Sequence, residues 1–144
     1  MRFNSKLFRG SLAAAYLNHK YKKAAPPNYG VVTPTFTETA FNDLASNVDR
    51  PSFLLDAFAD CVVRNQPAHA FHLFASKPTG KIEKIIFEQL QPTMRVCLSV
   101  KDGDQVEFTT TSLRGLMAEA AYDLDLRYFE DKSEKTTQKI GADS

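Results

Sequence analysis

The spacing of apolar residues changes once along this chain, and that change limits the folds open to it. Up to about residue 65, apolar residues recur every three or four positions, which is the period of an amphipathic helix. From His69 onward they alternate with polar residues, which is typical of a strand with one buried face. The pattern predicts a single α+β domain with two N-terminal helices, an antiparallel sheet of three or four strands, and a C-terminal helix packed on one face.

Capping and breaking signals set the expected helix ends. Thr35 and Glu38 have the spacing of a capping box, and Pro51 follows the first helix of the body. The last helix is expected to open at a cap on Thr111 or Ser112. The predicted helices of the body cover residues 36–48, 52–64 and 111–129.

The strand predictions depend on alternation and on turn residues. Asp102-Gly103 is a strong hairpin signal between two alternating segments, Met94–Val100 and Val106–Thr110. His69–Ala75 is interpreted as a further strand. Residues 81–90 fit either a helix or a strand, and their β-branched content favours the strand.

The charge is distributed unevenly. Residues 1–37 contain six basic and no acidic residues, whereas residues 38–144 contain 12 basic and all 17 acidic residues, a net charge of −5. We therefore divide the chain into a basic N-terminal arm with a Pro-containing linker (1–34), an α+β domain (35–129) and a charged flexible tail (130–144). Within the arm, residues 2–23 can form a helix that is amphipathic over its first three turns.

The apolar content is sufficient for one core, and it includes eleven Phe and no Trp. Cys61 and Cys97 are interpreted as two buried free thiols, with a single bridge left open, and this favours a reducing, intracellular compartment. No apolar stretch is long enough to span a membrane, and no secretory signal is recognisable. The residues predicted to form the core are Phe41, Leu44, Leu55, Phe58, Val62, Phe71, Leu98, Phe108, Leu116 and Leu124.

A search for catalytic or metal-binding patterns finds none that is specific. His69 and His72 would point to opposite faces of a strand. Lys77–Lys81 contains a Gly-Lys pair but lacks the earlier glycine of a phosphate-binding loop. The carboxylate pairs Asp56/Asp60 and Asp123/Asp125 are interpreted as solvated helix faces, because each lies opposite an apolar stripe. We therefore predict no catalytic residue, no metal site and no cofactor, and no enzyme activity.

The first ten residues resemble a mitochondrial presequence, which is a targeting signal and not a family. They carry Arg2, Lys6 and Arg9 on an amphipathic segment without acids, and Arg9-Gly10-Ser11 resembles a matrix-processing site. The resemblance implies import into mitochondria.

Three functions remain open. The first is a non-enzymatic interaction or assembly protein, such as a small accessory subunit of a larger complex, that uses the arm for targeting or docking. The second is a nucleic-acid-associated packaging or assembly protein of viral or phage type, which would bind phosphates of RNA or DNA through the arm. The third is a small adaptor or chaperone-like module. Other protein subunits are the expected partners, with a homo-oligomer also open, and the candidate binding residues are Arg2, Lys6, Arg9, Lys20, Lys22 and Lys23.

Overall fold

Every regular element in the described part of the chain is a helix. The structure is a computed structural model, and it describes residues 5–37, 50–98 and 109–142. These ranges contain five α-helices and one turn of 3-10 helix, and no strand. The predicted antiparallel sheet, and with it the α+β class, is therefore wrong for these residues. The elements are α1 (Ser5–Lys20), η1 (Tyr29–Val31), α3 (Arg50–Asn65), α4 (Pro67–Ala75), α5 (Lys81–Cys97) and α6 (Thr110–Ala142).

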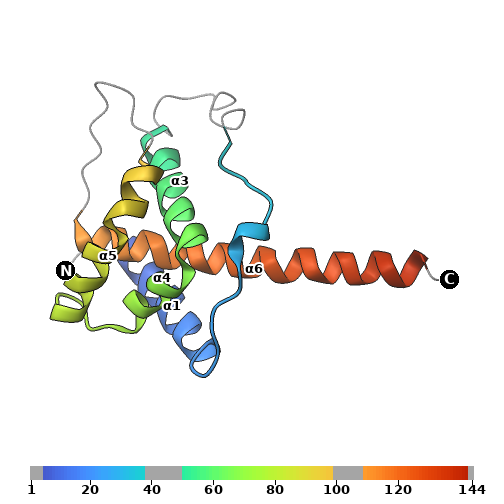
Figure 1. Cartoon of the computed structure of the whole chain (residues 1–144), viewed down its shortest axis with the longest axis horizontal. Coiled ribbons are helices and arrows are strands. Elements are labelled where there is room, and N and C mark those ends of the chain that lie inside the picture. Colours follow the sequence, from blue (N-terminus) through green and yellow to red (C-terminus); the bar gives the residue numbers. More distant parts are fainter. Residues whose placement is uncertain (1–4, 38–49, 99–108, 143–144) are drawn as a thin grey trace.

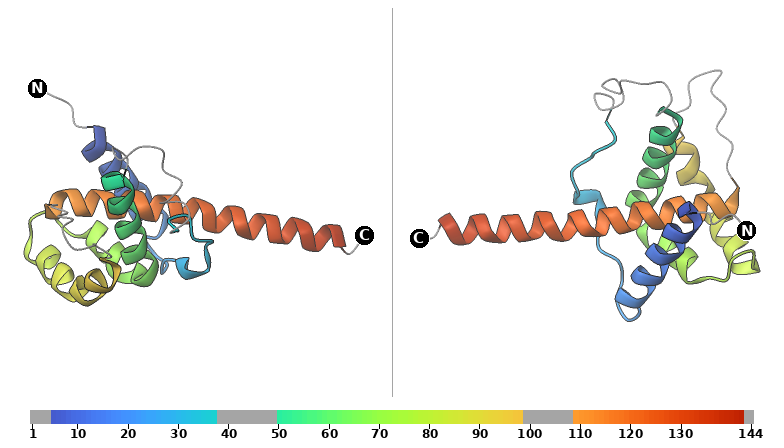
Figure 2. Two further views of the ribbon diagram at one scale, coloured as in Figure 1. Left: turned by 90° about the horizontal axis from the view of Figure 1, so that it is seen from above. Right: turned by 180° about the vertical axis from the view of Figure 1, so that it is seen from behind.

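One long helix organises the molecule. The other helices gather around the first half of α6, and its second half continues past them (Figures 1 and 2). In Figure 1 α3, α4 and α5 lie toward the viewer, and α1 lies behind them. After a half-turn, α1 and α6 are the nearest elements (Figure 2, right). α1 and α6 together form the part of the molecule nearest the viewer in this view.

Three of the predicted helices are confirmed. The arm helix corresponds to α1, the helix over 52–64 corresponds to α3, and the C-terminal helix corresponds to α6. The N-terminal cap of α6 is Thr109, whose Oγ1 accepts a hydrogen bond from the backbone N–H of Ser112 at 3.1 Å. The helix also continues from residue 129 to Ala142, where the sequence leads us to expect a frayed tail.

The segment interpreted as the first strand forms α4 instead. Pro67 stands in the first turn, where its missing N–H costs nothing. The buried side chains of α4 are Ala70, Phe71, Leu73 and Phe74, which is a helical spacing. A short apolar run fits both the helical and the strand period. Here the contacts of α4 with α1, α3, α5 and α6 favour the helix.

The ambiguous residues 81–90 are also helical, and the helix extends into the predicted strand at Met94. In α5 the buried stripe is Glu83, Ile86, Phe87 and Leu90, while Ile82 and Ile85 are exposed. Met94 and Cys97 continue the stripe, whereas Val96 is 81% exposed. The alternation of Met94, Val96 and Leu98 therefore does not mark a buried strand face.

Several predictions fall outside the described residues. These are most of the helix over 36–48, the Asp102-Gly103 turn and the start of its return strand at 106–108. The candidate core residues Phe41, Leu44 and Phe108 lie there as well.

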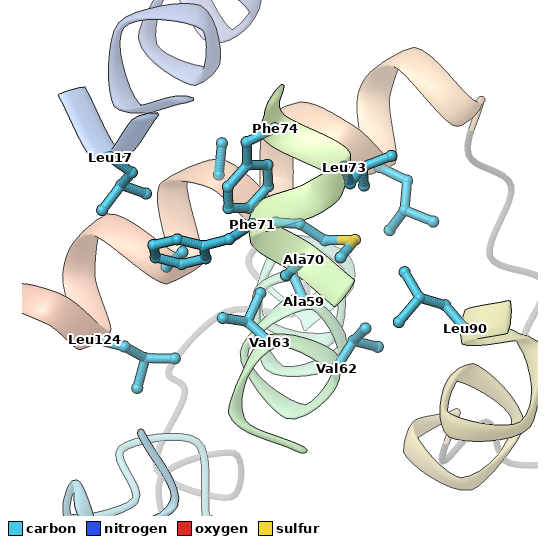
Figure 3. Close-up of a cluster of buried hydrophobic side chains, with 14 of the residues drawn as sticks. Leu17, Ala59, Val62, Val63, Ala70, Phe71, Leu73, Phe74, Leu90 and Leu124 are labelled. Atoms are coloured by element: carbon cyan, nitrogen blue, oxygen red, sulfur yellow. The ribbon is translucent and has the colours of Figure 1, made fainter. Parts of the chain in front are cut away.

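The core is centred on α4, which lies between α1, α3, α5 and α6 (Figure 3). Of the predicted core residues, Phe58, Val62, Phe71 and Leu124 are buried. Leu55 and Leu116 are half-buried, and Leu98 is 46% exposed, so its prediction is wrong.

The N-terminal segment shares this core. Ala13 and Leu17 of α1, together with Tyr29 and Val32 from the segment that follows it, belong to the same buried cluster as α3 and α4. Tyr29 is fully buried and packs against the ring of Phe71 with centroids 6.2 Å apart. The basic segment is therefore an integral part of the folded body as far as Val32.

Candidate protein-interaction face

The packing of α1 against α6 begins at a pair of glycines. A Cβ atom added at Gly10 would lie 2.8 Å from the Cα of Gly115, so the two backbones approach as closely as glycine permits. Farther along, Tyr16 meets Tyr122 edge to face with centroids 5.4 Å apart. α1 therefore crosses α6 obliquely (Figure 2, right), and the contacts advance along both helices in the same sense, from Gly10 and Gly115 to Tyr16 and Tyr122.

Five large apolar side chains beside this crossing are between 38% and 53% exposed. Leu12 and Tyr16 come from one side of α1, and Tyr122, Leu126 and Phe129 come from one side of α6. Single exposed apolar residues are common on proteins, but a contiguous group marks an interaction site. We call these five residues the α1–α6 face.

A groove of about 480 Å³ runs between the two helices within this face. Leu12, Ala13, Tyr16 and Tyr122 form its apolar lining. At one end Arg9 Nε lies 3.3 Å from Glu119 Oε1, and the Arg9 side chain is 62% exposed. The groove is open and mostly apolar, with one ion pair that joins its two walls.

At the other end of the face a buried carboxylate ties the N-terminal segment to α6. Asp125 is 1% exposed and accepts hydrogen bonds from Tyr29 Oη at 2.9 Å, Tyr21 Oη at 2.5 Å and Lys20 Nζ at 2.6 Å. Lys20 Nζ also lies 4.0 Å from the centroid of the Phe129 ring, a cation–π distance. Asp125 is therefore a structural anchor, and its interpretation as a solvated residue is wrong.

The two phenols of this anchor stay neutral over a wide pH range. Burial raises the pKa of Tyr29 far above its ordinary value of about 10, and the hydrogen bond to the Asp125 carboxylate raises it further. The same two causes, in the same order, raise the pKa of Tyr21. Each neutral phenol therefore donates a hydrogen bond to the carboxylate, and these two bonds hold the turn after α1 and η1 against α6.

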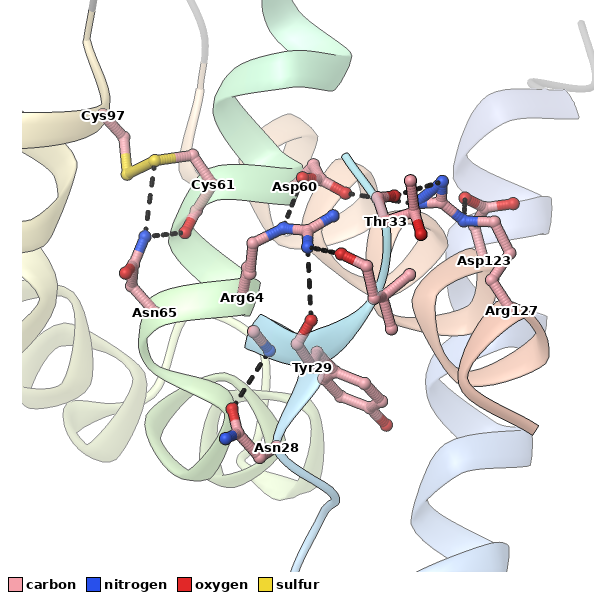
Figure 4. A network of polar contacts seen from close by, with 12 residues as sticks. Asn28, Tyr29, Thr33, Asp60, Cys61, Arg64, Asn65, Cys97, Asp123 and Arg127 are labelled. Atoms are coloured by element: carbon pink, nitrogen blue, oxygen red, sulfur yellow. Dashed lines mark hydrogen bonds and ion pairs between the residues drawn. A yellow bond between two sulfur atoms is a disulfide. The ribbon is translucent and has the colours of Figure 1, made fainter. Parts of the chain in front are cut away.

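A second polar cluster fastens the segment around η1 to α3 (Figure 4). The guanidinium of Arg64 donates hydrogen bonds to the backbone carbonyls of Tyr29 and Val32 and to Asp60, at 3.2 Å for Asp60. Asp60 is 7% exposed, so its assignment to a solvated face is wrong, whereas Asp123 has a 60% exposed side chain. Both acids also lie near Arg127, whose Nη1 donates to the Thr33 carbonyl at 3.4 Å.

Arg114 holds the remaining helices together in the same way. Its guanidinium reaches the carbonyls of Phe74 and Ser76 at the end of α4 and Glu83 Oε2 on α5, the last at 3.0 Å. Glu83 in turn accepts a hydrogen bond from the backbone N–H of Thr79. The buried acids of the described helices are thus each paired with an arginine or a lysine and serve packing.

The two cysteines form a disulfide between α3 and the last residue of α5. Cys61 and Cys97 have Cα atoms 5.7 Å apart, and Asn65 Nδ2 lies 3.6 Å from Cys61 Sγ (Figure 4). The favoured interpretation of two free thiols is therefore wrong. The bridge holds the final turn of α5, beyond Pro92, against α3.

Four of the six predicted binding residues have described side chains, and these differ in their surroundings. Arg9 pairs with Glu119, and Lys20 pairs with the buried Asp125, so both already have acidic partners within the chain. Lys22 and Lys23 are exposed at the turn after α1. Arg2 lies outside the described residues, and Lys6 lies in α1 with an undescribed side chain.

The α1–α6 face was not predicted, although its signal is in the sequence. Leu12 and Tyr16 are four residues apart, and Tyr122, Leu126 and Phe129 follow the spacing i, i+4 and i+7. Each row lies beside the buried stripe of its own helix, and a helix that has a second apolar row has more apolar surface than one core can cover.

Among the described helices, none has the length and apolar character to cross a membrane. Within the same residues, no three His, Cys, Asp or Glu side chains are grouped so that they could hold a metal ion. Comparisons of the chain with protein-family models, with curated proteins and with solved structures return no match.

Proposed function

We propose that this protein is a non-enzymatic interaction and assembly protein that binds a protein partner through the α1–α6 face. The observation that carries the proposal is the set of five partly exposed apolar side chains on two packed helices, three of which, Leu12, Tyr16 and Tyr122, line one groove. Aromatic residues are enriched in the centres of protein interfaces, and Tyr16, Tyr122 and Phe129 supply three here. An accessory subunit or an adaptor would use such a surface.

The charges around the face favour a protein over a nucleic acid as the partner. A phosphate backbone requires a row of uncompensated basic residues. Among the described basic side chains of the arm, Arg9 and Lys20 are each matched by a carboxylate, and Lys22 and Lys23 are the other two. Binding of RNA or DNA phosphates is therefore the second candidate, with those two lysines as its contact.

The packing of α1 also supports docking over targeting as the role of the basic segment. Processing between Gly10 and Ser11 would remove Gly10, the point of closest approach to α6, together with Arg9 and its ion pair. The disulfide supports residence in an oxidising compartment, because reducing compartments keep thiols free.

Site-specific photo-cross-linking tests the proposal. A photoreactive phenylalanine analogue replaces Leu126 in the full chain, which is expressed in cells of its source, and a matched chain carries the analogue at Ile82 of α5. Both positions are exposed, but only Leu126 lies on the α1–α6 face. We expect a discrete protein adduct from position 126 and none from position 82. Equal labelling from both positions, or adducts with nucleic acid alone, would contradict the proposal.

A further inference from the structure

We propose that the disulfide between Cys61 and Cys97 is a redox switch. A dithiol reductant opens it and releases the last turn of α5 from α3, while the rest of the fold stays in place. The switch lies on α3 and α5, which contribute nothing to the α1–α6 face, so the inference goes beyond the proposed function. It follows from the burial of the side chains along α5, from the position of its proline and from the surroundings of the bridge.

The side chains that fix α5 in the core all come before Pro92. The buried residues of this helix are Glu83, Ile86, Phe87 and Leu90. After the proline, Met94 and Cys97 are half-buried at the edge of the core, and Arg95 and Val96 are exposed. Because burial of apolar area is the main noncovalent force that holds a helix on its neighbours, packing holds the last turn of α5 weakly. The bridge from Cys97 is therefore its principal link to α3.

Pro92 also weakens the backbone of α5 between the packed part and the last turn. Proline has no N–H, so the carbonyl of Glu88, four residues earlier, receives no helical hydrogen bond from it. The ladder of hydrogen bonds is thus interrupted where the buried residues end. The last turn can separate from α3 at this point without disturbing the packed part of the helix.

The surroundings of the bridge suit thiol–disulfide exchange. Cys61 and Cys97 both retain solvent exposure, so a reductant can approach them in the folded protein. Asn65 Nδ2 donates a hydrogen bond to the Cys61 carbonyl at 2.8 Å and lies 3.6 Å from Cys61 Sγ (Figure 4). An amide N–H beside this sulfur stabilises its thiolate form. Cys61 is therefore the better leaving group, and attack is directed to Cys97.

The exchange has two steps. A thiolate of the dithiol, of the kind that thiol–disulfide oxidoreductases carry, bonds to Cys97 Sγ, and the electron pair of the broken S–S bond goes to Cys61 Sγ, which takes up a proton. The second thiolate of the reductant then attacks its own sulfur in the mixed disulfide, and Cys97 leaves as a thiol. In total, two electrons and two protons pass from the dithiol to the bridge, and the reductant becomes a disulfide. In an oxidising compartment the closed form persists until such a dithiol acts on it.

Limited digestion with trypsin tests the switch, because α5 carries exposed cleavage sites on both sides of Pro92. Lys84 lies in the packed part of the helix, and Arg95 lies in its last turn. Proteases cut the opened form of a segment, so the rate of cleavage at a site reports how often that segment opens. We expect reduction of the full chain by a dithiol to speed cleavage after Arg95 at least about tenfold and to leave Lys84 protected. Mass spectrometry of the products over time gives both rates.

The double variant Cys61→Ser with Cys97→Ser should show the same pattern without reductant. Equal resistance of Arg95 in the oxidised and the reduced chain overturns the inference. Equal rates of cleavage after Lys84 and Arg95 in the reduced chain also overturn it, because the bridge would then hold the whole domain and not one turn. Either failure leaves the proposed function standing, since cross-linking from the α1–α6 face tests that function separately.

Discussion

Gly10 and Gly115 meet where α1 packs on α6, but only one of them is constrained by that contact. A Cβ atom at Gly10 would lie 2.8 Å from the Cα of Gly115, whereas a Cβ atom at Gly115 would meet nothing within 4 Å. Because the obstructing atoms are backbone, the helices themselves must separate to admit a side chain at residue 10.

The two glycines give a matched pair of substitutions. Alanine is favoured over glycine inside a helix by about 1 kcal/mol, and this gain applies at both positions. We expect Gly115→Ala to raise the free energy of unfolding by up to about 1 kcal/mol. Gly10→Ala should lower it by about 1–3 kcal/mol, since overpacking outweighs the gain. Urea unfolding of both variants checks this, and equal effects would show that the close approach is absent.

Asp125 should be the most sensitive acid of α6. Its replacement by Ala leaves the hydroxyl groups of Tyr21 and Tyr29 without their acceptor, and each unsatisfied buried group costs about 1–3 kcal/mol. We expect Asp125→Ala to reduce the free energy of unfolding by about 3 kcal/mol. Asp123→Ala, two residues away, removes the exposed acid of an ion pair with Arg127 and should cost less, about 1 kcal/mol. A small effect at Asp125 would mean that the anchor is not formed.

The same anchor predicts a loss of stability at alkaline pH. The pKa of Tyr29 is raised in the folded state, so above about pH 10 the unfolded chain releases a proton that the folded chain keeps. Stability is therefore fully present below pH 10 and falls as the pH rises further. Urea unfolding at pH 8 and about pH 10.5 should show a smaller fall for Tyr29→Phe than for the wild type. Parallel falls would contradict the assignment.

The disulfide should contribute to stability by restricting the unfolded chain. Cys61 and Cys97 are 36 residues apart, and closure of such a loop is worth about 4 kcal/mol in the chain-entropy account. We expect the double substitution Cys61→Ser with Cys97→Ser to lower the free energy of unfolding by about 3–4 kcal/mol. The denatured protein should take up a thiol reagent only after reduction. Uptake before reduction would contradict the bridge.

The sequence predicts the helices whose apolar stripe is long and regular. α3 and α6 fall where the spacing of Phe58, Val62 and Leu124 places them, and these three side chains are buried. The strand prediction at α4 is wrong because its nine mostly apolar residues fit both the helical and the strand period. Contacts with helices distant in the sequence decide for the helix. In α5, burial of Glu83 depends on Arg114, 31 residues later, which a local pattern cannot reveal.

The candidate site was predicted less well than the helices. The basic residues of the N-terminal segment are predicted to bind a partner because no acid lies near them in the sequence. In the fold, however, Arg9 pairs with Glu119 and Lys20 pairs with Asp125. The pairing is visible only once α1 lies on α6. The apolar rows of the face are present in the sequence, but periodicity does not distinguish a covered row from an exposed one.

Photo-cross-linking from the α1–α6 face tests the central claim most directly. Leu12 of this face and Ile85 of α5 are 53% and 51% exposed, so a photoreactive phenylalanine analogue is equally accessible at either position. The account predicts a discrete protein adduct from position 12 and none from position 85. Equal labelling from both positions would contradict it.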